Sequence, residues 1–141
     1  MAAFGHDFEL AKAVGDYRPE SWEKALSNGA SIWGETYRGT LFFNAKDVQY
    51  LLSIYRVDET LAFLYSANGI GGVHLRYLVS VADADQLDRF VAMPDLADMP
   101  VGSFLPWTEG AAVICDFLRD PSAPPISTEW SDISALSWPA G

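Results

Sequence analysis

The chain has 141 residues, of which half are hydrophobic and a fifth are charged, and its formal net charge is −10. This balance is typical of one soluble globular domain and argues against a disordered chain. The acidic excess disfavours direct binding of nucleic acid or of an anionic membrane, because both require clustered Lys and Arg side chains. The single cysteine, Cys115, excludes an internal disulfide and a zinc site built from paired cysteines. With no secretory leader and no apolar run long enough to cross a membrane, we expect a cytoplasmic protein.

The first half of the chain predicts three helices and two strands. In chain order these are a helix over 8–14, a helix that begins at Pro19 and stops before Gly29, strands over 32–37 and 40–44, and a helix over 48–55 capped by Asp47. The second helix carries Trp22 on its apolar face, so this side chain is expected in the core. The third helix rests on apolar residues at helical spacing, namely Val48, Leu51, Leu52 and Tyr55.

The clearest pattern in the sequence is a β-hairpin near the middle of the chain. A strand over 60–67 is followed by the turn dipeptide Asn68-Gly69 and then by strict alternation over 73–81. The alternation places five apolar residues on one face of the second strand, namely Val73, Leu75, Tyr77, Val79 and Val81.

Four further elements follow the hairpin. They are strands over 89–93 and 101–106, a helix capped by Thr108 that runs to about Leu118, and a last strand over 126–131. The order of all these elements predicts a single α+β domain over residues 1–141, with a largely antiparallel sheet flanked by helices.

No group of residues predicts catalysis, a metal site or a cofactor. The two histidines are expected at the surface, His6 in a flexible N-terminal segment and His74 on the polar face of a strand. Cys115 lies in a predicted helix beside an aspartate, which is typical of a buried, unreactive thiol. The glycines of 69–72 lack the following helix and the Gly-Lys-Ser/Thr ending of a phosphate-binding loop.

Acidic residues gather in the second half of the chain. Residues 1–80 carry 9 acidic and 7 basic residues, whereas residues 81–141 carry 10 acidic and 2 basic residues. Five aspartates lie within one short stretch, namely Asp83, Asp85, Asp88, Asp95 and Asp98. Their spacing does not fit a calcium loop, because Leu87 and Pro94 occupy positions that need ligands. Two interpretations stay open, a solvated acidic loop and an electrostatic docking surface for a basic protein.

Residues 61–132 resemble the type-one immunity protein family of bacterial polymorphic toxin systems. The resemblance is carried by the hairpin and by a C-terminal pattern of a proline approach, a helix, a proline-bearing loop and a strand that closes with tryptophan. In this chain the C-terminal parts are Phe104-Leu105-Pro106, Phe117-Leu118, Pro124-Pro125 and Ile126–Trp130. The loop departs from the family pattern, because Asp120–Ala123 stands where the family often has Gly and Arg.

The resemblance implies a binding protein that neutralises a cognate toxin, often one with a nucleic-acid deaminase fold, and not an enzyme. The chain is not itself a deaminase, because one cysteine cannot supply the zinc ligands of that chemistry. An acidic inhibitor can mimic a phosphate backbone and occlude a basic active-site groove. The five aspartates are therefore the predicted partner-binding residues. The alternatives are a small enzyme or ligand-binding domain with a pocket under the sheet, and an adaptor that binds without inhibiting.

Overall fold

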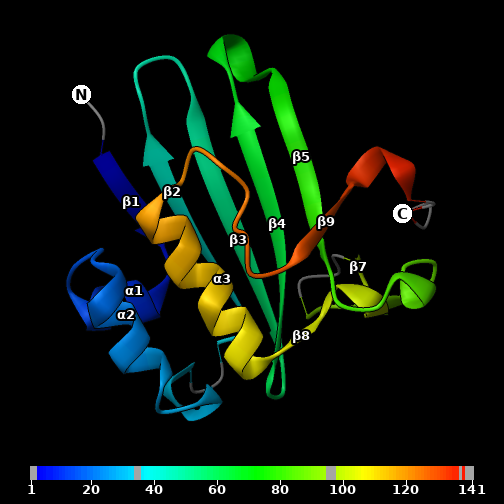
Figure 1. Cartoon of the computed structure of the whole chain (residues 1–141), viewed down its shortest axis with the longest axis horizontal. Helices are drawn as coiled ribbons and strands as arrows, with labels where there is room; N and C mark the ends of the chain where they lie inside the picture. Colours follow the sequence, from blue (N-terminus) through cyan, green and yellow to red (C-terminus); the bar gives the residue numbers. More distant parts are fainter. Residues whose placement is uncertain (1–2, 34–35, 95–97, 137, 139–141) are drawn as a thin grey trace.

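One antiparallel sheet organises the computed structural model, which describes residues 3–33, 36–94, 98–136 and Trp138. Within these residues its strands are β1 (Ala3–Asp7), β2 (Arg38–Asn44), β3 (Gln49–Val57), β4 (Thr60–Asn68), β5 (His74–Val81), β8 (Leu105–Pro106) and β9 (Glu129–Asp132). Their order across the sheet is β1-β2-β3-β4-β5-β9, and β8 pairs with the first two residues of β4 (Figure 1). All neighbours run antiparallel, as the predicted fold class requires.

The α-helices lie on one face of this sheet (Figure 1). They are α1 (Glu9–Val14), α2 (Pro19–Leu26) and α3 (Trp107–Arg119). Pro19 starts α2 because its fixed φ suits a first helical position, where an amide proton would lack a partner. The indole N–H of Trp107 donates to the carbonyl of Leu26 at 2.9 Å, which joins the start of α3 to the end of α2.

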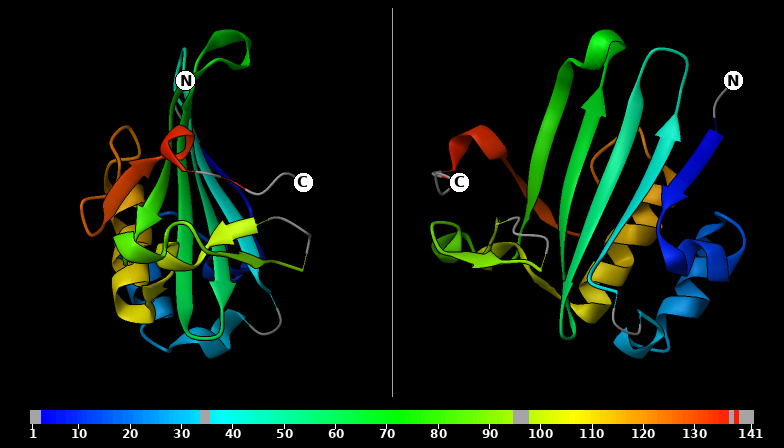
Figure 2. Two further views of the ribbon diagram at one scale, coloured as in Figure 1. Left: turned by 90° about the vertical axis from the view of Figure 1, so that its right-hand side faces the viewer. Right: turned by 180° about the vertical axis from the view of Figure 1, so that it is seen from behind.

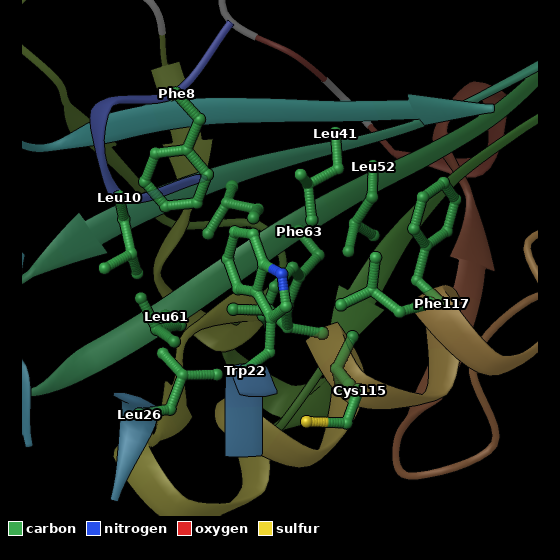
Figure 3. Packing of buried hydrophobic residues seen from close by; sticks show 14 of the residues in the cluster. Phe8, Leu10, Trp22, Leu26, Leu41, Leu52, Leu61, Phe63, Cys115 and Phe117 are labelled. Carbon is green, nitrogen blue, oxygen red and sulfur yellow. The ribbon is translucent and has the colours of Figure 1, made fainter. Parts of the chain in front are cut away.

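The main hydrophobic core fills the layer between the helices and the sheet (Figure 3). Trp22 of α2 and Phe117 of α3 meet Leu52 of β3 and Phe63 of β4 there, and all four side chains are fully buried. The predicted core position of Trp22 is thus confirmed. Ring contacts extend the core to Phe8, whose ring centroid lies 5.9 Å from that of Trp22.

The opposite face of the sheet is covered by a small two-stranded ribbon, β6 (Phe90–Ala92) with β7 (Asp98–Pro100). Figure 2 shows the ribbon on the side of the sheet away from the helices. A second core cluster lies beneath it and contains Tyr55, Ala62, Val79, Met93 and Met99. Both faces of the sheet are therefore covered where the ribbon lies. Along β3 and β4, successive side chains there point into one core cluster and then into the other.

Three predictions for the first half of the chain are wrong. The segment 48–55 is not a helix capped by Asp47 but most of β3, which a tight turn joins to β2, with Ala45 N–H donating to Val48 C=O at 2.9 Å. A strand over 32–37 was expected before β2, but 32–33 belong to the 3₁₀ turn Ala30–Trp33 and 36–37 precede the strand, whereas 34–35 lie outside the described residues. His6 lies in edge strand β1 opposite Leu41, and not in a flexible segment.

The other elements of the first half are confirmed within a few residues. The helix over 8–14 is α1, the helix from Pro19 is α2, and the strand over 40–44 lies within β2. Gly29 follows α2 with a φ of 82°, a left-handed conformation that glycine adopts without strain.

The second half follows the predicted order more closely. The hairpin strands over 60–67 and 73–81 are β4 and β5, and β6 falls within 89–93. The segment 101–106 is only partly a strand, because a 3₁₀ turn at Val101–Ser103 precedes β8. The predicted last strand over 126–131 forms only from Glu129 onward, as β9.

The start of α3 differs from its prediction. Pro106 occupies the N-cap position in place of Thr108, and no side chain caps the helix. The packing of Trp107 against the end of α2 fixes this helix start in place of a hydroxyl cap.

The first residues of β5 project past both cores. Leu75 and Val73, which precedes the strand, were predicted on one face with Val79, yet they are 59% and 60% exposed while Val79 is fully buried. The predicted alternation is right from Arg76 onward and wrong before it, because the register against β4 shifts by one residue between Arg76 and His74. This bulge brings the ring of His74, which was predicted on the opposite face, to 5.0 Å from that of Tyr77. An open stretch of sheet surface remains beside the ribbon.

Candidate partner-binding site

The predicted acidic residues lie on and beside the β6–β7 ribbon. Asp83, Asp85 and Asp88 are exposed on the segment 82–89, which contains the short 3₁₀ turn Ala84–Gln86. Asp98 is half-buried at the start of β7, and Asp95 lies outside the described residues. We call the segment 82–89 the acidic segment. Three of the predicted residues are thus brought together, whereas Asp98 occupies a different environment.

The acidic segment is fixed to the rest of the protein at both ends. The carbonyl of Gly102 accepts the N–H groups of Ala82 at 2.7 Å and of Asp83 at 3.0 Å. At the other end the N–H of Val101 donates to the carbonyl of Arg89 at 2.7 Å. Within the segment, the Asp83 carboxylate accepts the N–H of Asp85 at 3.0 Å and caps the 3₁₀ turn. Hydrogen bonds thus tie both ends of this segment to residues 101 and 102.

Gly102 is needed where the acidic segment meets the Val101–Ser103 turn. A Cβ atom at this position would lie 2.0 Å from the backbone oxygen of Asp83, far inside van der Waals contact. We expect Gly102→Ala to lower the free energy of unfolding by about 1–3 kcal/mol, because the backbones must separate. Faster amide hydrogen exchange at Ala82 and Asp83 should accompany the loss, since their N–H groups bond to residue 102.

Gly69→Ala is the matched control for this substitution. A Cβ atom at Gly69 would meet only the Leu75 side chain at 3.6 Å, which is ordinary contact. Its effect on the free energy of unfolding should stay within about 0.5 kcal/mol. Equal free energies of unfolding for the two variants would show that the close approach of Gly102 to Asp83 does not affect stability.

Charges on the acidic segment are not neutralised by neighbours. Arg89, the one basic residue of the segment, donates to the side-chain oxygen of Gln86 at 3.0 Å. In the part of the chain that the structure describes, no side-chain hydrogen bond or ion pair engages the carboxylates of Asp85 and Asp88. These carboxylates are open to a partner.

Three other acidic residues of the second half are instead bound locally. Asp116 accepts hydrogen bonds from Ser127 and pairs with Arg119 at 3.4 Å. Asp120 accepts the Ser122 hydroxyl at 2.6 Å. The side-chain and backbone donors of Ser134 lower the pKa of Asp132 from its usual value. Asp116, Asp120 and Asp132 therefore differ from Asp85 and Asp88, whose carboxylates have no such local donors among the described residues.

A pocket of about 290 Å³ opens between the sheet and the β6–β7 ribbon. It is lined by Tyr55, Leu64, Tyr77, Asp98, Met99, Ile133 and Trp138. Trp138 is held there by its indole N–H, which donates to the carbonyl of Ile133 at 2.8 Å, and by Phe90, whose ring centroid lies 5.2 Å away. Among the described residues that line the pocket, Asp98 is the one acidic residue, and the others are aromatic or aliphatic. We call this site the Asp98 pocket.

Two larger hollows have no comparable lining. One of about 570 Å³ is lined by Asp7 and by 36–40, and another of about 420 Å³ lies between the loops 44–49 and 68–74. Both have charged lining residues, but among the described ones the first has a single aromatic residue, Tyr37, and the second a single aromatic ring, that of His74. Size therefore does not mark the best binding site in this protein.

The residues capable of catalysis are dispersed. His6 lies on β1, with its Nδ1 atom 2.6 Å from the Tyr17 hydroxyl, whereas His74 begins β5 and contacts Asn68 at 2.6 Å. Cys115 is buried in α3, and this burial raises the pKa of its thiol to about 11. Over the described ranges, no three His, Cys, Asp or Glu side chains are grouped so that they could hold a metal ion.

Sequence reasoning missed most of the Asp98 pocket. The alternation over 73–81 did place Tyr77 on the face of Val79, which is the face that the pocket uses. Tyr55 was assigned to a helix, and Trp138 has no periodic neighbours that could locate it.

No protein-family model, curated protein or solved structure matches the chain. Within the described residues, no helix is long and apolar enough to cross a membrane.

Proposed function

We propose that this protein is an immunity protein that acts in the cytoplasm, where it binds a cognate toxin and occludes its active-site groove. The toxin is expected to be a nucleic-acid deaminase, and the immunity protein itself catalyses no reaction. The observation that carries the proposal is the acidic segment, whose backbone is fixed at both ends while Asp85 and Asp88 remain exposed and unpaired in the described structure. The resemblance of residues 61–132 to immunity proteins supports the same conclusion.

The physical basis is electrostatic complementarity. A toxin that acts on DNA or RNA needs a basic groove to hold the phosphate backbone. Carboxylates on a fixed segment can occupy that groove without first losing backbone entropy. They also steer the two proteins together, so association should be fast at low salt and slower at high salt.

The experiment begins with co-expression of the chain and the C-terminal domain of a toxin encoded next to it. Cells should survive only when both are present, and the two proteins should co-purify in equal amounts. Survival without a complex, or a stable complex without protection, would overturn the proposal.

Charge reversal then tests the acidic segment. Asp85→Lys combined with Asp88→Lys should lower the association rate constant by about tenfold or more at low salt and flatten its salt dependence. The control is Glu20→Lys with Glu59→Lys, which changes the net charge equally at two exposed sites elsewhere. Stopped-flow kinetics compares the two variants with the native protein. The same loss in both would show that total charge matters and the acidic segment does not.

The Asp98 pocket keeps a second candidate open, a small-molecule binding protein. Its volume of about 290 Å³ lies at the lower limit of ligand pockets, which usually range over about 300–1,000 Å³. This size suits one side chain of a protein partner better than a whole cofactor. Tight binding of a metabolite that Tyr77→Ala abolishes would favour the second candidate.

A further inference from the structure

The Asp98 pocket combines the two features that bind organic cations. Tyr55, Tyr77 and Trp138 are aromatic residues of its lining, and the faces of aromatic rings carry partial negative charge; Asp98 is the acidic residue among the described lining residues. Apolar walls from Leu64 and the ribbon limit the water around a bound group, which strengthens both attractions. A pocket of this composition favours a cationic group on an aliphatic stem.

We propose that the Asp98 pocket receives a single Lys or Arg side chain from the basic toxin. This inference rests on the proposed function for the identity of the partner, but the cation preference follows from the pocket alone. The stem of the side chain would contact Leu64 and the rings, and its charged end would meet Asp98. A side chain held in the pocket would slow dissociation of the complex, whereas the charges of the acidic segment would speed its association.

The surroundings of the pocket fit a protein partner. The open end of β5 carries the exposed Leu75 on the same strand as Tyr77 of the pocket, and the exposed Val73 directly precedes this strand. On the other side Asp98 begins β7, which pairs with β6, the strand that directly follows the acidic segment. A basic surface laid across the ribbon would therefore meet an apolar edge, a cation pocket and open carboxylates.

One ring of the pocket already has a cation nearby. The guanidinium carbon of Arg38 lies 5.3 Å from the centroid of Tyr55, within the range of a cation–π contact. An incoming cation therefore depends mainly on Tyr77, Trp138 and Asp98. Trp138 is already held in place by its bond to Ile133, so little side-chain entropy is lost there.

The test uses small cationic probes and needs no toxin. Nα-acetyl-lysine methylamide and Nα-acetyl-arginine methylamide are titrated into the ¹⁵N-labelled protein, with the norleucine analogue as a neutral probe of similar shape. The indole N–H signal of Trp138 is assigned by its disappearance in Trp138→Phe. We expect this signal to shift saturably with at least one of the cationic probes and weakly or not at all with norleucine.

Substitutions locate the site. Asp98→Asn should raise the Kd of the cationic probe about fivefold or more, because the carboxylate is replaced by a neutral amide of similar shape. Asp85→Asn removes an equal charge from the acidic segment and should leave the Kd unchanged. Unchanged chemical shifts elsewhere in the spectrum confirm that both variants are folded.

Three outcomes would overturn the inference. They are the absence of a saturable shift, equal binding of norleucine and the cations, and unchanged cation binding in Asp98→Asn. Because no toxin takes part, each of these leaves the proposed function standing. Conversely, a working cation pocket in a protein that protects cells from no toxin would refute the proposed function alone.

Discussion

Replacing Trp22 by alanine should lower the free energy of unfolding by about 3–5 kcal/mol, the usual loss for a large aromatic side chain in a core. Trp22 is fully buried at the centre of the layer between α2, α3 and the sheet. Its ring contacts Phe8, and its indole N–H donates to the carbonyl of Asp16 at 2.8 Å. The substitution leaves a cavity and also leaves this carbonyl without its partner. Since a small domain is stable by only about 5–15 kcal/mol, much of its stability would be lost.

Urea unfolding followed by circular dichroism measures the effect. Trp22→Phe is the control, because it keeps most of the apolar contacts while it removes the N–H donor. We expect it to lose clearly less stability than Trp22→Ala. A loss below about 1 kcal/mol for the alanine variant would show that the core tolerates the cavity, contrary to the packing described here.

The second large effect is expected at Ser80, whose fully buried hydroxyl group joins the sheet to the Val101–Ser103 turn. It accepts the N–H of Phe63 at 2.9 Å and donates to the carbonyl of Ser103 at 2.8 Å. Both bonds lie beyond the point where the β4–β5 ladder ends, at Leu64 opposite Val79. The hydroxyl therefore replaces a ladder bond that the backbone no longer makes.

Ser80→Ala leaves a buried donor and a buried acceptor without partners. Each unsatisfied group costs about 1–3 kcal/mol, so we expect the free energy of unfolding to fall by about 2–4 kcal/mol. Ser66→Ala is the matched control on neighbouring strand β4, since no hydrogen bond of the Ser66 hydroxyl is found among the described residues. Its effect should stay within about 0.5 kcal/mol. Similar losses in both variants would contradict the role of the Ser80 bridge.

The sequence predicts best those elements whose residue pattern is compatible with only one type of secondary structure. Alternation over 73–81 after the Asn68-Gly69 dipeptide fits only a hairpin, and β4 and β5 form it. Pro19 and the apolar face around Trp22 likewise fit only a helix. In each case local propensity and packing agree, except at the exposed start of β5, where the register also shifts.

The error at 48–55 arises because two cores cover β3. Leu52 and Ile54 face the helices, whereas Tyr55 and Val57 face the β6–β7 ribbon. Burial on both faces removes the alternation of a strand and leaves a pattern that also fits helical spacing. Only pairing with β2 and β4, which lie elsewhere in the sequence, decides between the two structures.

Edge strand β1 was missed for a related reason. Its sequence combines Gly5, His6 and Asp7, residues with little preference for strands. Pairing with β2 forms the strand nevertheless, and Gly5 leaves room for the ring of Phe42, which a Cβ atom would meet at 2.3 Å. Such a long-range fit has no local signal.

The candidate site was predicted in part. Clustering along the sequence was enough to place Asp83, Asp85 and Asp88 together, because a short segment cannot separate them widely. The separate environment of Asp98 depends on the pairing of β7 with β6 and on the return of Trp138 to the ribbon. Both are tertiary contacts that composition and spacing do not encode.

The burial of Cys115 has a practical consequence for studying such complexes. Its thiol is 5% exposed, and with a pKa of about 11 it is almost wholly protonated at neutral pH, whereas alkylating reagents attack the thiolate. A cysteine introduced at an exposed position such as Asp85 would therefore react with a maleimide dye selectively, with the native residue left in place. The protein thus allows fluorescence measurements of docking distance without a cysteine-free background.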